Sequence, residues 1–273
     1  MGTCLGILFL MWFVSGIVMM YHTYPRIEKK QALAFAEDID TCMLPIRELM
    51  DELLVREPVR SISLGKRAGE NVIRVSTERD EFLLNARTGL PLERFTTGQL
   101  QQVANRWSAG AAMLKDTLTQ IDVWLIGAYP FKDFPVYHYC FPDGEKGELY
   151  LSSRTGDALQ YTTWKSRFWA WVGAIPHWIY IKQFRAHGRQ PWTNIVLWVS
   201  GIGILMTLSG LYVGIRSFGV ALKRHKRGTP YRKRLFRWHH LSGLCFGLFT
   251  LTWIFSGFMS LAQVPQWVSK VHE

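Results

Sequence analysis

The sequence predicts an α-helical membrane protein with three spans and, between the first and second spans, an inserted α+β domain of two tandem modules. Three observations predict this fold class. Long uncharged stretches occur near both ends of the chain, a nearly neutral region separates them, and the positive charge is concentrated in one short segment. A chain of 273 residues with 48% apolar composition has room for one folded domain and a few membrane helices.

The clearest span covers residues 238–263, because no charged side chain occurs from Leu241 to Ala262. At about 1.5 Å per helical residue, this stretch extends about 33 Å, which is enough to cross the hydrocarbon core of a bilayer. Two adjacent histidines, His239 and His240, stand at the entry of this span. Apart from these two histidines and Cys245, the span contains no titratable side chain.

The first span, residues 1–22, repeats the third. The two segments share identities in one register, among them Gly2 with Gly243, Cys4 with Cys245, Gly6 with Gly247, Trp12 with Trp253, Ser15 with Ser256 and Gly16 with Gly257. We infer an internal repeat of one membrane helix. Counterparts of His239 and His240 would precede Met1, so either the first span lacks this pair or the chain begins inside a longer one. A signal peptide is disfavoured because the basic n-region and the small-residue cleavage pattern are both missing.

The charge distribution predicts the topology. Residues 23–167 contain 19 basic and 20 acidic side chains, whereas Arg216–Arg237 contains nine basic side chains and no acidic one. A basic run can bind nucleic acid, but a short basic loop between two spans is typical of the cytoplasmic side of a membrane. We therefore predict a lipid bilayer and no nucleic acid as partner. The chain is expected to start in the cytoplasm and to expose residues 23–190 on the other side.

The exported region contains a second duplication. The segments Phe82–Leu92 and Leu149–Leu159 share Arg-Thr-Gly, and each is predicted to be a strand that ends at a glycine turn. Apolar residues at helical spacing precede them in Cys42–Arg56 and Gly98–Ile121. The remaining strand candidates are Val59–Leu64, Asn71–Ser76, Val123–Ala128 and Pro135–Phe141. Each module is therefore predicted to be one helix followed by three short antiparallel strands.

The spacing of polar residues in these modules predicts no catalytic residue. His138 has no ligand-type partner at helical or hairpin spacing, so we interpret it as a satisfied strand histidine. Cys42 and Cys140 both lie in the exported region, where a disulfide is chemically permitted. The sequence does not show whether these two cysteines meet.

The chain then returns to the membrane. Phe168–Ile181 is too short to span and is rich in Trp and Tyr, which favour the bilayer interface, and Pro176 predicts a bend just before His177. The second span follows, with glycines that allow close helix approach. The predicted boundaries are 1–22 for the first span, 23–97 and 98–167 for the two modules, 168–190 for the interfacial segment, 191–215 for the second span, 216–237 for the basic loop, 238–263 for the third span and 264–273 for a tail.

The histidines fall into two layers. His22 and His177 are predicted at the outer boundary, and His239 and His240 at the inner one. A single histidine at a membrane boundary is often only an interfacial residue. Two layers separated by glycine-lined helices favour haem, because neutral imidazole is a good axial ligand and a flat porphyrin packs against small residues. We therefore predict haem bound by these histidines; metal ions other than haem are disfavoured because no H-x-x-x-H or C-x-x-C motif occurs.

Three motifs also carry a family resemblance. The Arg-Thr-Gly modules, the segment RFWAWVGAIPHWIYI and the segment RWHHLSGLCFGLFTLTWIFSGF resemble PepSY-associated transmembrane proteins over essentially the whole chain. The resemblance implies a multi-pass protein of the bacterial inner membrane with two periplasmic PepSY-like modules. It also implies a b-haem reductase that passes electrons outward to a ferric siderophore in iron uptake. His239, four residues before Gly243, matches the family's usual first histidine, and His177 matches that of the aromatic segment, whereas His22 is inferred from its depth alone. The predicted cofactor is thus haem b, with its iron bound by His22, His177 and His239, and with His240 as a close second to His239.

The chain departs from the family at both ends. Family members usually have a histidine ahead of the first span and often continue past the third span into a fourth helix, so we expect a truncated chain or a misplaced start. An inner haem that needs a ligand from before Met1 would then not form, whereas an outer site of His22 and His177 would remain. The alternative function is a non-enzymatic PepSY membrane protein that binds or regulates a periplasmic partner, because the modules show no active site. A third hypothesis is a non-functional fragment.

Overall fold

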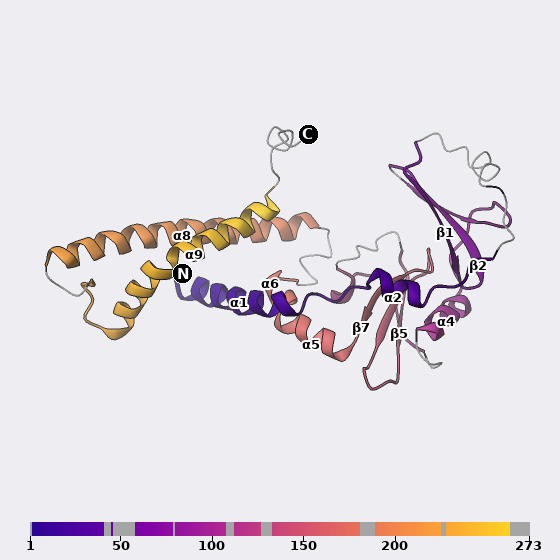
Figure 1. The fold of residues 1–273 in the computed structure, drawn as a ribbon, viewed down its shortest axis with the longest axis horizontal. Helices are drawn as coiled ribbons and strands as arrows, with labels where there is room; N and C mark the ends of the chain where they lie inside the picture. The colour runs from indigo at the N-terminus through magenta and orange to yellow at the C-terminus, as the bar shows by residue number, and fades with distance from the viewer. Residues whose placement is uncertain are drawn as a thin grey trace. The chain divides into compact units, whose positions relative to one another are not determined.

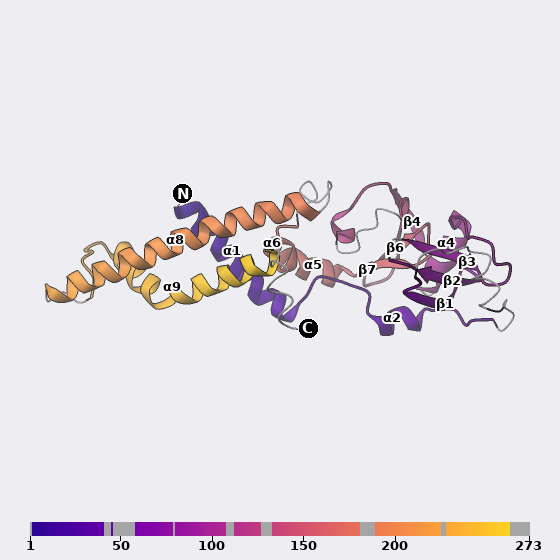
Figure 2. The same cartoon turned by 90° about the horizontal axis from the view of Figure 1, so that it is seen from above.

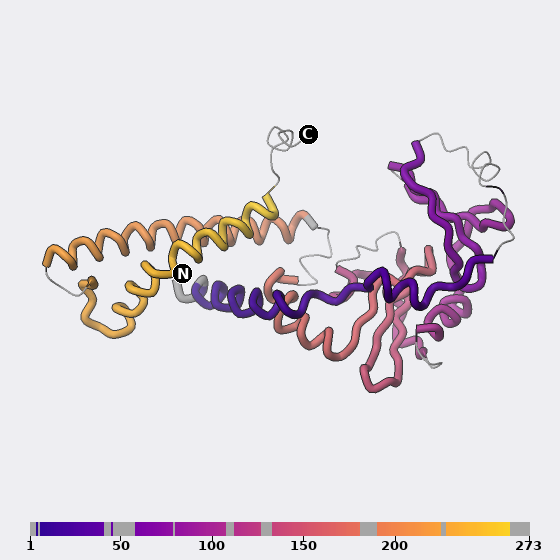
Figure 3. Tube along the Cα trace, viewed as in Figure 1, coloured from indigo at the N-terminus to yellow at the C-terminus, as the bar shows by residue number. Residues whose placement is uncertain are grey.

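The computed structural model describes residues 2–40, 45, 58–78, 80–107, 112–126, 133–180, 189–224 and 228–262. The chain contains both helices and sheets (Figure 1), and the coloured part of the tube in Figure 3 follows the described residues. It divides into two compact units, one of residues 6–186 and the other of residues 1–5 and 187–273. The first unit carries the β-sheets and the second carries two long helices.

The first unit contains a helical part and two antiparallel sheets. Its helices are α1 (Gly2–Tyr21, in this unit from Gly6 onward), α2 (Lys29–Ala34), α4 (Thr97–Arg106), α5 (Trp164–Val172) and α6 (Ala174–His177), with a short 3-10 turn η1 (Val123–Leu125). One sheet has the order β1-β2-β3, formed by Ser61–Arg67, Glu70–Ser76 and Glu81–Asn85. The other has the order β4-β5-β6-β7, formed by Met113–Leu118, Val136–Cys140, Glu148–Ser152 and Ala158–Thr162.

The duplicated Arg-Thr-Gly turns have the same backbone geometry. Gly89 and Gly156 have positive φ angles of 77° and 67°, which side-chain-bearing residues rarely adopt. The amide of Gly89 donates to the carbonyl of Asn85, and the amide of Gly156 donates to that of Ser152, both at 2.9 Å. The predicted glycine turns after β3 and β6 are therefore confirmed.

Two predictions for the second module were wrong. The helix predicted over Gly98–Ile121 ends at Arg106, and Met113–Leu118 instead forms β4 because it pairs with β5. Tertiary pairing overrides a local pattern that fits a helix. The strand predicted from Val123 is the turn η1, which starts where the Asp122 carboxylate accepts from the Val123 amide at 2.7 Å. The sequence also missed β7, and the helix predicted over Cys42–Arg56 lies outside the described residues.

The two modules share one hydrophobic core around α4. Helix α4 begins at a capping box of Thr96 and Gln99 and buries Leu100 and Ala104. The same cluster contains residues of both sheets, among them Val72, Leu83, Tyr139, Leu149 and Leu151. Because one helix contributes to the burial of both sheets, the two modules share one hydrophobic core and do not fold as separate domains.

A second core cluster lies on the opposite face of the four-stranded sheet, since successive residues of a strand point to opposite faces. Val136 and Tyr150 on that face pack with Tyr24, which follows α1, and with Ala174 of α6. Trp124, Leu125, Ala170 and Ile175 complete the buried cluster. The sheet is therefore packed directly against the chain segments that leave and return to the predicted membrane boundary.

Ion pairs fix the second Arg-Thr-Gly turn to the first module. Arg67 Nε lies 2.8 Å from Asp157 Oδ1, and Arg74 also pairs with Asp157. Arg154 of the turn reaches Glu81 at the start of β3, at 2.8 Å. Burial raises the pKa of Asp157, but the charges of Arg74 and Arg67 outweigh it and hold that pKa below its ordinary value.

The second unit is a pair of helices, α8 (Arg189–Lys223) and α9 (Arg234–Leu261), which pack along each other (Figure 2). Both are long and apolar enough to cross a membrane by length and composition. The first predicted span forms the apolar helix α1 of 20 residues, and its crossing of a membrane stays a prediction. Helix α8 continues through the first eight residues of the segment predicted as a loop, 216–223.

Glycines allow these two helices to approach each other closely. The buried residues of α9 recur every seven positions at His240, Gly247 and Ile254, which is the spacing of a helix-helix seam. A Cβ on Gly247 would lie 2.6 Å from Leu211 Cδ2, and one on Gly214 would lie 3.1 Å from Leu244 Cδ2. The close helix approach expected of the glycines is thus found at Gly214.

Of the cysteines, Cys140 at the end of β5 carries a free thiol, as do Cys4 and Cys245. The fourth, Cys42, lies outside the described residues.

Candidate functional site

The first candidate site is the junction of α1, α5 and α6. Gly173 separates α5 from α6, and a Cβ there would lie 3.0 Å from Val18 Cγ1 and 3.1 Å from the carbonyl oxygen of Trp169. Because Gly173 has no side chain, the bend between α5 and α6 can lie close to α1. The bend that we associated with Pro176 is located at Gly173. Pro176 itself lies in the first turn of α6, where its missing N–H costs no helical hydrogen bond.

This bend places His177 against the backbone of α1. Its Nδ1 lies 3.1 Å from the carbonyl oxygen of Trp12 and 3.3 Å from Ser15 Oγ. Because a carbonyl oxygen can only accept, Nδ1 carries the hydrogen and Nε2 carries the lone pair. Burial lowers the pKa of His177, and the hydrogen bond to Trp12 offsets only part of that effect, so the ring is neutral at pH 7. A metal-binding histidine commonly has this arrangement.

His22 lies at the same junction but has a different partner. It is exposed, follows the last residue of α1, and stacks on Trp169 with ring centroids 4.1 Å apart and planes 7° apart. His177 contacts α1 at Ser15, seven residues before His22, which is about 10 Å along the helix. The structure thus brings both histidines to one junction without a described contact between their rings. Binding of one iron by both rings would require His22 to leave Trp169, and the shared site stays a prediction.

The two inner histidines face different directions on α9. His239 is exposed, whereas His240 is buried and its Nε2 donates to the carbonyl of Gly214 at 2.9 Å. The His240 Nδ1 is buried without a hydrogen-bond partner among the described residues. With its Nε2 held by Gly214, His240 keeps only the buried Nδ1 for binding iron, and its role as a ligand stays a prediction. His239, which is not held in the helix contact, keeps its place as the predicted ligand.

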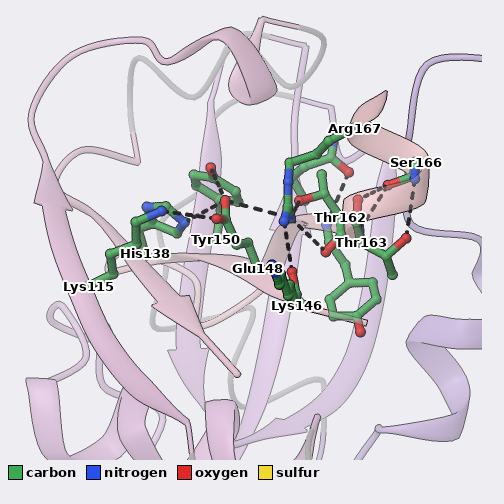
Figure 4. Close-up of polar contacts among 12 residues, drawn as sticks. Lys115, His138, Lys146, Glu148, Tyr150, Thr162, Thr163, Ser166 and Arg167 are labelled. Carbon is green, nitrogen blue, oxygen red and sulfur yellow. Dashed lines mark hydrogen bonds and ion pairs between the residues drawn. The ribbon is translucent and has the colours of Figure 1, made fainter. Parts of the chain in front are cut away.

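Sequence reasoning missed a second polar site, which lies between the four-stranded sheet and α5 (Figure 4). The Glu148 carboxylate lies 3.1 Å from His138 Nε2, 2.9 Å from Lys115 Nζ and 3.8 Å from Arg167 Nη1. The Tyr150 hydroxyl lies 3.4 Å from the same carboxylate, and the His138 ring stacks on Tyr150 at 4.2 Å. His138 is therefore a buried, hydrogen-bonded strand histidine, as predicted.

The charges of this cluster favour an ionised Glu148. Burial by itself raises the pKa of Glu148, but hydrogen bonds from His138 and Lys115 and the charge of Arg167 outweigh it and lower the pKa from 4.5 to about 2. Burial also raises the pKa of Tyr150 above its ordinary value. A carboxylate this acidic is a poor general base near pH 7. The cluster is therefore suited to holding structure and not to proton transfer.

Arg167 joins this cluster to α5. Its Nη1 donates to Thr162 Oγ1 at 2.9 Å and its Nη2 donates to the carbonyl of Lys146 at 2.9 Å, both visible in Figure 4. Helix α5 continues to Trp169, the partner of His22. One sequence signal for the cluster existed, namely an acidic residue directly before the apolar residues of strand β6. The hairpin register, which pairs Cys140 with Glu148 and His138 with Tyr150, was not predictable from spacing.

Comparisons with protein-family models, with curated proteins and with solved structures each gave no match to this chain. Among the described residues, no group of three or more His, Cys, Asp and Glu side chains could hold a metal ion.

Proposed function

We propose that this chain is a membrane electron-transfer protein that binds haem b, related to PepSY-associated transmembrane proteins, with His177 as its outer iron ligand. The hydrogen bond from His177 Nδ1 to the Trp12 carbonyl carries the proposal. It fixes the tautomer whose Nε2 can bind iron, and it comes from the backbone of a helix, which is a rigid support. His22 and His239 are the further ligands proposed, because each is exposed at a helix end or face.

The residues of the chain would contribute binding and orientation. Haem b, when bound, supplies one-electron oxidation and reduction. Trp12 and Ser15 hold the His177 ring, and its burial keeps it neutral, as an iron ligand must be. Trp169 covers one face of His22 and would release it for iron binding.

The proposed acceptor is a ferric siderophore on the periplasmic side of a bacterial inner membrane, reduced during iron uptake. The support for this acceptor is the resemblance to the family, together with the two tandem α+β modules. The second core cluster packs the four-stranded sheet against α6, which carries His177. A chelate bound to the modules would therefore lie on the same compact unit as the proposed outer ligand.

A second candidate is a non-enzymatic PepSY protein that binds a periplasmic partner. The edge strand β4 favours it, because five of its six residues are exposed and the sheet order leaves one side of β4 unpaired among the described strands. Such an edge can accept an extended peptide segment. This candidate predicts that His177→Ala leaves function unchanged.

The test is a reduced-minus-oxidised absorption spectrum of the full chain, purified in detergent from haem-supplied cells. We expect a b-type signal that His177→Ala reduces strongly and that His225→Ala, a control in the basic segment, leaves intact. A signal that persists unchanged in His177→Ala would remove His177 from the site. Absence of any b-type signal in the haem-supplied protein would contradict the proposed function and favour the partner-binding candidate.

A further inference from the structure

The segment that connects α8 and α9 carries positive charge that its own unit cannot neutralise. Residues 187–273 contain eleven basic side chains and one acidic side chain, Glu273, and residues 1–5 contain neither. The described basic residues at the end of α8, in the connection and at the start of α9 are all exposed, namely Arg216, Lys223, Arg224, Arg232, Lys233, Arg234 and Arg237. Clustered cations of this kind need anions from outside the unit.

The described residues just before α9 contact both helices. Gly228 has a φ of 69°, and a Cβ there would lie 2.8 Å from the Phe218 ring of α8. On the other side, the ring of Tyr231 lies edge-on to His240 of α9, with centroids 5.4 Å apart. The basic side chains are therefore held at the end of the helix pair where the apolar stretches of both helices stop.

Exposed apolar side chains alternate with these charges at the start of α9. Leu235 is 84% exposed, Phe236 57% and Trp238 64%, and they are interleaved with Arg234 and Arg237. Aromatic residues next to Lys and Arg are typical of the headgroup level of a bilayer. Single-stranded nucleic acid also stacks on aromatic rings, but Leu235, the most exposed of the three, has no ring on which a base could stack. The composition therefore favours lipid.

From these observations we propose that the described basic residues of 216–224 and 232–237 bind the phosphate groups of anionic phospholipids, with Leu235, Phe236 and Trp238 inserted beside them. The described apolar helices end at this segment, so a bilayer around them would place its phosphates at the level of the basic residues. Each Lys or Arg near such a surface contributes about fivefold to partitioning. This inference is independent of haem binding.

Native mass spectrometry of the full chain in non-ionic detergent tests the proposal, with phosphatidylglycerol or phosphatidylcholine as the added lipid. We expect a preference for phosphatidylglycerol of about tenfold or more, because several charges act together. Replacement of Arg232, Lys233, Arg234 and Arg237 by Gln is expected to reduce the preference at least severalfold, because four of the charges are removed. The matched control replaces four exposed basic residues of the other unit, Lys29, Lys30, Arg60 and Arg87, by Gln and is expected to keep it.

A measurement on the unaltered chain tests the proposal even if the variant misfolds. In about 1 M salt, where the Debye length is about 3 Å, the preference for phosphatidylglycerol is expected to fall toward that for phosphatidylcholine. Equal binding of the two lipids by the unaltered chain at low salt would overturn the proposal. So would an equal loss in the control variant, or tighter binding of a labelled single-stranded RNA than of phosphatidylglycerol.

Discussion

Replacement of Glu148 by Gln tests whether the cluster of Figure 4 stabilises the unit of residues 6–186 through charge. The side chain is only 15% exposed, and its pKa is lowered from 4.5 to about 2 by groups that remain in the variant. One pKa unit corresponds to about 1.4 kcal/mol, so ionised Glu148 contributes about 3 kcal/mol to the free energy of unfolding at pH 7. Gln has nearly the same shape but no charge to offer His138, Lys115 and Arg167. We therefore expect the free energy of unfolding of Glu148→Gln at pH 7 to be lower by about 3 kcal/mol.

The sign of the pH dependence follows from the direction of the shift. Because the folded state has the lower pKa, the stabilisation is fully present above pH 4.5 and is lost as the pH falls from there toward 2. At about pH 3 the difference between the two proteins is expected to be less than half of that at pH 7. The assay is urea unfolding of the full chain in detergent at the two pH values, followed by tryptophan fluorescence.

Glu145→Gln is the matched control, because Glu145 is 52% exposed and pairs with an exposed Lys165 at 3.5 Å. Exposed pairs of this kind contribute little, so the control is expected to unfold with nearly the free energy of the unaltered chain. A loss in Glu148→Gln that is the same at pH 7 and pH 3 would refute the electrostatic argument. A loss no larger than that of the control would also refute it.

Two further predictions concern packing and the contact between the modules. Gly247→Leu is expected to lower the midpoint of thermal unfolding in detergent more than Gly243→Leu, because a Cβ at 247 meets Leu211 at 2.6 Å and one at 243 meets nothing within 4 Å; equal midpoints would contradict the described seam. Asp157→Asn is expected to destabilise the unit of residues 6–186 at pH 7 through loss of its pairs with Arg67 and Arg74. Since the pKa of Asp157 is lowered in the folded state, the penalty should shrink as the pH falls below about 4, and a penalty that is constant with pH would show that charge is not the cause.

Local patterns in the sequence predicted several elements correctly. The strands at Asn71–Ser76 and around His138 and the glycine turns at Gly89 and Gly156 depend on alternation and on backbone freedom, which neighbouring residues decide. The helix prediction for Met113–Leu118 was wrong, because the apolar spacing of this stretch fits a helix as well as a strand. Its pairing with β5, which decides the structure, is a long-range contact. For the same reason the sequence did not reveal that Glu148 lies beside His138, since the register of a hairpin is set by its turn and its pairing.

The sequence by itself determined where apolar helices occur, where the positive charge is concentrated and which residues form tight turns, because composition and near-neighbour sterics suffice for these properties. Only the tertiary structure decided the chemistry of the histidines. His239 and His240 are adjacent in sequence, yet one is exposed and the other donates to Gly214. Likewise, the Nδ1 of His177 is engaged by a carbonyl that lies 165 residues earlier in the chain. A ring nitrogen takes its role from the atom that faces it in space.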